Sequence, residues 1–200
     1  MSMPATEPPT ATETRPPRPG GRRLLPWLGL LLPLVAIGAL VALELLRPAP
    51  APATIGSAAP DFELADTAGE SESLAEALAE GEEGVLVYFS MGVGCGGCFA
   101  QIPEIAQPLA DRGIRLVSIM VDEADITRIE AERYGATTPV GLDHDRTVSE
   151  AYGVLGVYGH GDRPSHSFVR VDASGTITDV RHYAEMFVPI EQLLADLDLA

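Results

Sequence analysis

The sequence has only two cysteines, Cys95 and Cys98, among its 200 residues. Two cysteines cannot form the several disulfide bonds that hold a small secreted miniprotein together. They also exclude a structural zinc site made of four cysteines. Because 46% of the residues are hydrophobic, the composition is instead that of an ordinary folded domain with its own core.

Basic residues are scarce as well. From residue 48 onward the chain has 26 aspartates and glutamates but only 8 arginines, which gives a net charge of about −18. A surface of this charge repels nucleic acid and anionic lipid. We therefore expect no nucleic-acid partner, and we interpret the acidic surface as a shell that keeps the domain soluble.

One long apolar run stands near the start of the chain. Residues 24–43, LLPWLGLLLPLVAIGALVAL, carry no charge. A helix of this length spans about 30 Å, the thickness of the hydrocarbon core of a bilayer. We predict a transmembrane anchor over residues 24–46. Residues 1–23 are too poor in large apolar groups to fold, so we expect a disordered tail there.

The charges that flank this run set its orientation. Four arginines lie between residues 15 and 23, whereas only Arg47 follows closely. The positive-inside rule then keeps the N-terminal tail in the cytoplasm and places the rest outside, as in a single-pass protein of the cell membrane. A cleaved signal peptide, with APA at residues 51–53 as its cleavage site, is the alternative. Its apolar region should have only roughly 7–15 residues, so a retained anchor is favoured.

After the apolar run, residues 47–56 alternate proline with alanine. This composition is typical of an extended, semi-rigid linker. The folded domain is then expected over residues 57–200, which is enough chain to bury roughly two thirds of its unfolded surface in one core.

Strand and helix patterns alternate through this domain. Residues 84–90 are a continuous β-branched and aromatic run, as found in strands buried on both faces, and residues 114–122 are expected to form a second buried strand. A helical pattern follows each run, and in the helix at residues 125–134 we expect Ile126 and Ile129 to face inward. The other expected elements are a strand at 61–64, helices at 72–81 and 99–113, a hairpin at 167–183 and a final helix opened by Pro189. Together they predict an α/β fold in which helices flank a central mixed β-sheet.

The two cysteines lie where a glycine-rich turn leads from the first buried strand into the next helix. At the entrance of that helix, unpaired N–H groups and the helix dipole favour a thiolate on Cys95. The pKa of such a thiol falls from about 8.5 into the range of roughly 3.5–7.5. We predict that Cys95 is the nucleophile and that Cys98, one turn inward, resolves the mixed disulfide. Gly96 and Gly97 let the short loop close.

Two other interpretations of this CxxC motif are possible. Half of a zinc site would need two further ligands, and the chain offers only four scattered histidines. An inert disulfide staple would restrain the unfolded chain little, because its loop contains only two residues. Redox exchange is the interpretation that we favour.

Pro103 supplies a further signal. It lies eight residues after Cys95, inside an otherwise helical pattern, where a proline costs about 3 kcal/mol. This stretch resembles the thioredoxin superfamily, whose active-site helix begins with CxxC and carries a kinking proline at this offset. The resemblance covers most of residues 57–200. GSAAPDFELADTAGE resembles the opening of TlpA-like and AhpC/TSA-type redoxins, and PSHSFVRVDASGTI resembles their closing hairpin.

The resemblance implies further features. YGVLG at residues 152–156 is similar to the segment before the cis-proline loop of these redoxins. Pro164 would then be the cis-proline beside the CxxC, with the backbone of Arg163 pairing with an extended substrate segment. A membrane anchor before a redoxin domain is the TlpA-like layout. It implies an extracytoplasmic thiol–disulfide oxidoreductase without a cofactor that reduces disulfides of exported proteins, such as those of apocytochrome c, and is re-reduced by a membrane thiol donor.

The chain departs from the family pattern at several positions. Gly94 stands where relatives have an aromatic residue before the first cysteine, and residues 158–163 look like an insertion. Tyr88 stands where relatives carry a polar or acidic residue under the active site. The proton acceptor for Cys98 is therefore not identified by the motif, and Glu104 or a water molecule are the candidates.

Two other functions compete with disulfide exchange. A peroxiredoxin-like peroxidase needs a threonine and a proline just upstream of its reactive cysteine, and FSMGVGC has neither. A Sco-like copper chaperone pairs two cysteines with a distant histidine, for which His166 is suitably placed. Sco-like sites use CxxxC, however, so we expect His166 to be a loop histidine that is hydrogen-bonded near the site.

The remaining candidate ligands have simpler interpretations. His144 and His160 lie in polar, turn-rich stretches and are expected to be solvated. Asp143 and Asp145 suggest a metal site, but a turn and the cap of the following helix explain them better. We therefore predict no metal site.

Overall fold

The computed structural model describes residues 33, 35–39 and 53–200. The predicted tail lies outside these residues, as do most of the predicted anchor and all but the last four residues of the predicted linker. Residues 33 and 35–39 are helical. Among the described residues, no helix has both the length and the apolar character needed to cross a bilayer. The chain divides into two units, Met1–Ala49 and Pro50–Ala200, and the second contains both cysteines.

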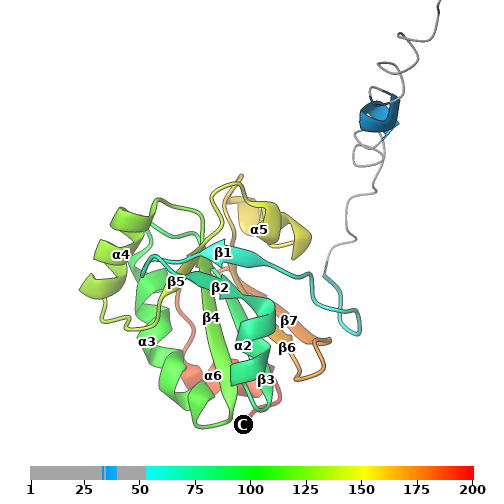
Figure 1. The fold of residues 1–200 in the computed structure, drawn as a ribbon. Coiled ribbons are helices and arrows are strands. Elements are labelled where there is room, and N and C mark those ends of the chain that lie inside the picture. The colour runs from blue at the N-terminus through cyan, green and yellow to red at the C-terminus, as the bar shows by residue number, and fades with distance from the viewer. Residues whose placement is uncertain (1–32, 34, 40–52) are drawn as a thin grey trace, which may run out of the picture. The chain divides into compact units, whose positions relative to one another are not determined.

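A five-stranded sheet of order β5-β4-β3-β6-β7 forms the centre of this unit (Figure 1). The middle strand β3 (Gly84–Phe89) pairs in parallel with β4 (Ile114–Met120) and antiparallel with β6 (His166–Val171). On the outer sides, β5 (Val140–Leu142) pairs in parallel with β4, and β7 (Ile177–Tyr183) pairs antiparallel with β6. The predicted central mixed sheet and its C-terminal hairpin are therefore confirmed. A separate two-stranded sheet joins β1 (Glu63–Ala65) to β2 (Ser71–Ser73).

Helices cover both faces of the sheet, because β3 alternates its side chains between two cores. All six residues of β3 are buried. Leu86 and Tyr88 belong to a core that includes α3 and α6, whereas Val85, Val87 and Phe89 belong to a second core that includes α2 and α5. The helices are α2 (Leu74–Glu80), α3 (Gly96–Ala110), α4 (Ala124–Arg133), α5 (Thr147–Ala151) and α6 (Ile190–Asp196), with a 3-10 turn η1 (Val157–Gly159).

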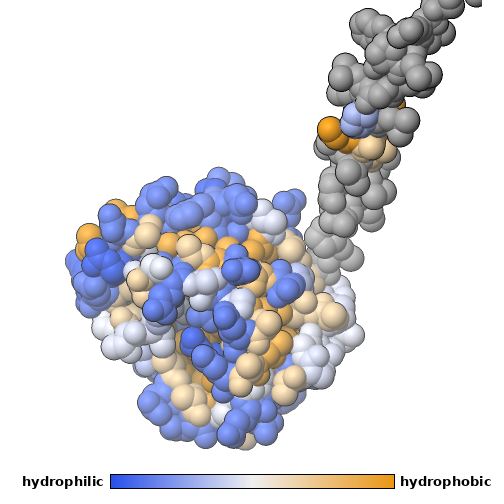
Figure 2. Space-filling model, viewed as in Figure 1, coloured by the Kyte–Doolittle hydropathy of each residue, from blue (hydrophilic) through white to orange (hydrophobic). Residues whose placement is uncertain are grey.

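Helix α4 is rotated relative to the prediction. Ile126 and Ile129 are 46% and 54% exposed, so the expectation that they face inward was wrong. Thr127 and Ala131 are the buried residues of α4, and the ring of Tyr134 at its end stacks on the α3 residue Phe99 at 6.2 Å between centroids. This packing sets the rotation of α4. Figure 2 shows hydrophobic surface over α4 and further hydrophobic surface near the middle of the same face.

Candidate redox site

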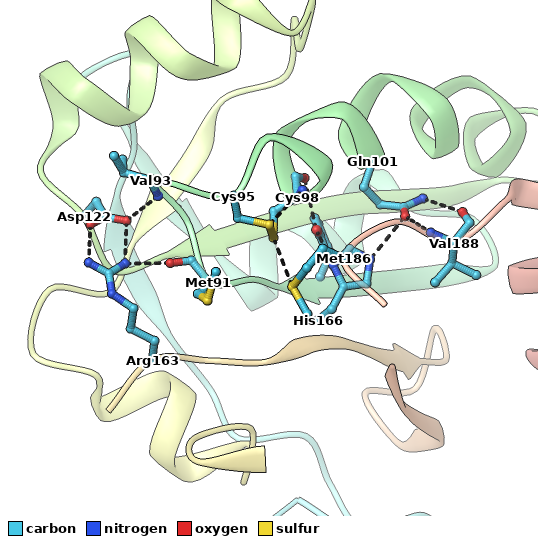
Figure 3. The surroundings of a disulfide bond; sticks show 11 residues. Met91, Val93, Cys95, Cys98, Gln101, Asp122, Arg163, His166, Met186 and Val188 are labelled. Carbon is cyan, nitrogen blue, oxygen red and sulfur yellow. Dashed lines mark hydrogen bonds and ion pairs between the residues drawn. A yellow bond between two sulfur atoms is a disulfide. The ribbon is translucent and has the colours of Figure 1, made fainter. Parts of the chain in front are cut away.

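Cys95 and Cys98 form a disulfide at the N-terminus of α3, with their Cα atoms 5.3 Å apart (Figure 3). Cys95 is the N-cap residue of the helix, and its sulfur accepts a hydrogen bond from the N–H of Cys98 at 3.2 Å. Cys95 is 5% exposed and Cys98 is fully buried. The structure therefore places both cysteines as predicted, with the sulfur of Cys95 in contact with a helix N–H that would stabilise a thiolate.

Two residues from distant segments cover the glycines between the cysteines. A Cβ atom on Gly97 would lie 2.6 Å from the carbonyl oxygen of Met186, and a Cβ on Gly96 would collide with the hydroxyl of Tyr134. The sulfur of Met186 also lies 3.9 Å from the sulfur of Cys98. This packing favours glycine at Gly97, where the clash is with backbone atoms, whereas at Gly96 the side chain of Tyr134 would have to move. No motif in the sequence points to Tyr134 or Met186, which reach the site only through the fold.

A charged pair holds the loop that precedes Cys95. Arg163 donates two hydrogen bonds to the carboxylate of Asp122, at 2.8 and 2.9 Å, and a third to the carbonyl of Met91 at 2.6 Å. Asp122 also accepts the N–H of Val93 at 2.7 Å. Burial opposes ionisation of Asp122, but the hydrogen bonds from Arg163 and Val93 outweigh it and lower its pKa. The side chain of Arg163 thus connects the segment before β6 to the active-site loop.

The proline expected beside the CxxC has a different geometry from that implied by the family resemblance. The described residues contain no cis peptide bond, so the implied cis conformation of Pro164 is corrected to trans. The inserted segment ends in turns, and Pro164 then forms a β-bridge with Leu155. The N–H of Arg163 donates to the carbonyl of His160 at 3.3 Å. Pairing of Arg163 with a substrate strand would therefore have to use its carbonyl oxygen.

A buried polar network lies behind Cys98. The hydroxyl of Tyr88 is 3.0 Å from the carbonyl oxygen of Cys98 and 3.0 Å from Nδ1 of His166. Nε2 of His166 lies 3.2 Å from the side-chain oxygen of Gln101. Burial raises the pKa of Tyr88 and lowers the pKa of His166 to about 4. The tyrosine is therefore un-ionised and the histidine neutral at neutral pH while the disulfide is intact.

This network changes the interpretation of His166. It is not a loop residue but the first residue of β6, fully buried and hydrogen-bonded through both ring nitrogens. Neither nitrogen is directed at the cysteine sulfurs as a ligand. Glu104, the proton acceptor considered from sequence, is a half-buried residue further along α3. Tyr88 is hydrogen-bonded to the backbone carbonyl of Cys98, and His166 is linked to this carbonyl through Tyr88.

The two aspartates act as caps, as expected from the sequence, whereas His160 is less solvated than expected, because its Nδ1 is buried without a hydrogen-bond partner. The carboxylate of Asp143 accepts hydrogen bonds from the N–H groups of Val148 and Ser149, at 3.2 and 2.7 Å, so it caps α5. Asp145 accepts the N–H of Thr147 at 3.0 Å. His144 is exposed, and His160 is partly buried. Within residues 53–200, no three His, Cys, Asp or Glu side chains are grouped in a way that could hold a metal ion.

A mixed sheet whose central strand leads into a CxxC disulfide at a helix N-terminus defines a thioredoxin-like redoxin. Residues 55–180 match the sequence model of the AhpC/TSA family. The match covers more than half of the chain, and the chain belongs to this family.

Individual relatives fall into two groups. The thiol-disulfide oxidoreductase ResA of Geobacillus thermodenitrificans is 32% identical over 129 residues, which are 62% of this chain and 71% of ResA. A Mycobacterium tuberculosis protein named as a peroxiredoxin is 28% identical over 153 residues, 73% of this chain and 96% of its own length. The crystal structure of peroxidoxin BcpB from Mycobacterium tuberculosis has a TM-score of 0.60 at 22% identity, covering 73% of this chain and 97% of BcpB. This last likeness shows the fold alone.

Proposed function

We propose that this protein is a membrane-anchored, extracytoplasmic thiol–disulfide oxidoreductase that reduces disulfides of exported partner proteins. The observation that carries the proposal is the Cys95–Cys98 disulfide, which closes across two glycines at the start of α3. Both cysteines of the sequence are in this bond. The similarity to ResA supports exchange with protein disulfides.

The reaction requires only the two sulfurs. In the reduced protein, the thiolate of Cys95 attacks one sulfur of the partner's disulfide, and the partner's second sulfur leaves as a thiolate that takes up a proton. The thiolate of Cys98 then attacks Cys95, restores the Cys95–Cys98 bond and releases the partner's first sulfur. Two electrons pass from the cysteine pair to the partner, and a membrane thiol donor returns them by the same steps in reverse.

The location of the protein is proposed from the sequence. The uncharged run at residues 24–43 and the arginines before it support a cytoplasmic N-terminus and a retained anchor. Membrane fractionation and protease accessibility test this. We expect the protein to remain in the membrane pellet after a carbonate wash and to be digested from the extracytoplasmic side. Release by carbonate would contradict the anchor without affecting the redox chemistry.

Insulin reduction tests the activity. We expect turnover by the wild type and its loss in Cys95→Ser, with exposed His144→Ala as the control that leaves turnover unchanged. Cys98→Ser should trap a mixed disulfide with insulin, because the resolving sulfur is absent. Activity that survives Cys95→Ser would rule out the mechanism. A reduction potential below about −220 mV supports a reductant, whereas one near −120 mV contradicts that direction.

A peroxidase is the second candidate, favoured by the relative named as a peroxiredoxin, which is matched over 96% of its length. Peroxide consumption separates the two functions. We expect slow consumption, since a thiolate reacts with peroxide to some extent in any setting. Consumption much faster than insulin reduction would identify the peroxidase.

A copper chaperone would bind Cu(I) stoichiometrically, and His166→Ala would abolish this binding. We expect His166→Ala to have no effect on Cu(I) binding, because both ring nitrogens of His166 are already hydrogen-bonded within the protein.

A further inference from the structure

The network behind Cys98 has an orientation that can be worked out from its donors and acceptors. The N–H of Val188 donates to the side-chain oxygen of Gln101 at 2.7 Å, and the side-chain nitrogen of Gln101 donates to the carbonyl of Val188 at 3.0 Å. These two bonds fix which end of the Gln101 amide is oxygen. The oxygen end faces Nε2 of His166, and because this oxygen only accepts, Nε2 must carry a hydrogen.

This assignment leaves the single hydrogen of the Tyr88 hydroxyl with two possible acceptors. With the hydrogen on Nε2, Nδ1 of His166 is an acceptor, and the carbonyl oxygen of Cys98 is another. Both lie 3.0 Å from the hydroxyl of Tyr88, which has a single hydrogen to donate. One more proton, on Nδ1, completes the chain: Nδ1 donates to the Tyr88 oxygen, and Tyr88 donates to the Cys98 carbonyl. The network is therefore built to accept one proton beside the resolving cysteine.

We propose that the Tyr88–His166–Gln101 network takes up one proton when the Cys95–Cys98 disulfide is reduced, and that this proton balances the thiolate left on the cysteine pair. A donor dithiol supplies two electrons and two protons as its sulfurs join and the Cys95–Cys98 bond breaks. One proton remains on the cysteine pair and the other is bound by His166, so that one cysteine is a thiolate and the imidazole is a cation. In this step His166 does not touch the reacting sulfurs: it holds the proton and acts on the cysteine pair through Tyr88.

The surroundings of His166 allow such a response. The titratable side chains in contact with it are Tyr88 from β3 and Tyr183 from β7, and Tyr88 links it to the backbone carbonyl of Cys98 at the start of α3; the rings of His166 and Tyr183 are 6.5 Å apart. No acidic or basic side chain of the described residues contributes to its lowered pKa, which burial alone explains. A thiolate formed on the cysteine pair is therefore the new charge to which this imidazole responds. The inference rests on the proposed redox function, because it concerns the reduced form of the pair.

Histidine titration in the full-length protein tests the proposal. Selective ¹³C labelling of histidine gives four imidazole signals for NMR, and replacing His144, His160 and His182 in turn identifies the signal of His166. In the oxidised protein we expect its midpoint at about pH 4. In the reduced protein we expect the midpoint to rise by at least about three pH units, which is about a thousandfold tighter proton binding and makes the imidazole largely a cation at neutral pH. An unchanged midpoint would overturn the proposal.

Two variants separate charge from conformation. Serine at both Cys95 and Cys98 cannot form a thiolate, so under the same reducing conditions His166 should keep the low midpoint of the oxidised protein. A rise that persists in this variant would also overturn the proposal. Tyr88→Phe keeps the ring but removes the hydrogen-bond link, and we expect the rise on reduction to shrink.

Binding linkage requires the reverse effect as well: protonated His166 must favour the thiolate by the same factor. In the reduced protein, His166→Gln should therefore raise the midpoint of thiolate absorbance at 240 nm, while a surface change such as His144→Ala should leave it unchanged. An unaltered midpoint in folded His166→Gln would contradict the proposal. Insulin reduction is measured in a separate assay. A protein that does not reduce insulin, but in which the midpoint of His166 rises on reduction, would refute the proposed function and leave the network supported.

Discussion

Replacement of Gly97 by alanine tests the close packing of the CxxC loop. The new Cβ would lie 2.6 Å from the carbonyl oxygen of Met186 and 3.2 Å from its carbonyl carbon. Both are backbone atoms, so the segment before α6 has to move. Overpacking of this kind costs about 1–3 kcal/mol, whereas alanine gains about 1 kcal/mol over glycine within a helix. We expect the free energy of unfolding to fall by up to about 2 kcal/mol.

Urea denaturation of the oxidised protein measures this difference. Gly141→Ala, in strand β5, is the matched control, because its Cβ would meet its nearest neighbour, the side chain of Leu64, at an ordinary 3.5 Å. We expect a change of less than about 0.5 kcal/mol for the control. A Gly97→Ala protein at least as stable as the wild type would refute the inferred contact with Met186. A movement of Met186 should also appear as faster alkylation of Cys98 in the reduced variant.

Three further perturbations follow from the site. Arg163→Ala should lower the free energy of unfolding, measured by urea denaturation, by about 1–2 kcal/mol, because it leaves the partly buried carboxylate of Asp122 without its ion pair. An unchanged free energy of unfolding would show that the pair does not hold the loop. Asp143→Ala should cost about 1–2 kcal/mol by the same assay, because α5 loses its cap, and an effect equal to that of Asp145→Ala would argue against this. Stability of the oxidised protein should fall as the pH decreases from about 6.5 to 4, because the pKa of His166 is lowered to about 4 in the folded state and the unfolded chain binds the proton first. The loss approaches about 3 kcal/mol, and the part due to this histidine should be absent in His166→Gln.

Much of the fold could be predicted because its signals are local. The buried run at residues 84–90 became β3, the hairpin at residues 167–183 became β6 and β7, and the helix after the cysteines begins at Gly96. Each depends on neighbouring residues in the chain. The three-residue strand β5 was missed, since Val140–Leu142 is too short to show a pattern. The rotation of α4 was predicted wrongly because the larger residues Ile126 and Ile129 were assumed to face the core, whereas the small Thr127 and Ala131 allow closer packing.

The candidate site divides in the same way. Cys95 and Cys98 were identified from their spacing and from the elements around them. Tyr134, Met186 and the side chain of Arg163 were not, because they reach the loop from other parts of the chain. The network at Tyr88 could have been suspected, since an aromatic hydroxyl in a fully buried strand needs a partner. Its partners, His166 and the carbonyl of Cys98, required the register of β3 against β6 and the position of α3.

The cover that Tyr134 and Met186 provide over the two glycines has a consequence for protein engineering. A graft of the four residues CGGC into another redoxin would transfer the disulfide loop but not the phenol of Tyr134 and the thioether of Met186, which pack against this loop. The reactivity of the grafted cysteines would then depend on the side chains that the new host has at those two places. A transplant of this motif therefore has to include the end of α4 and the segment before α6, although neither is adjacent to it in the chain.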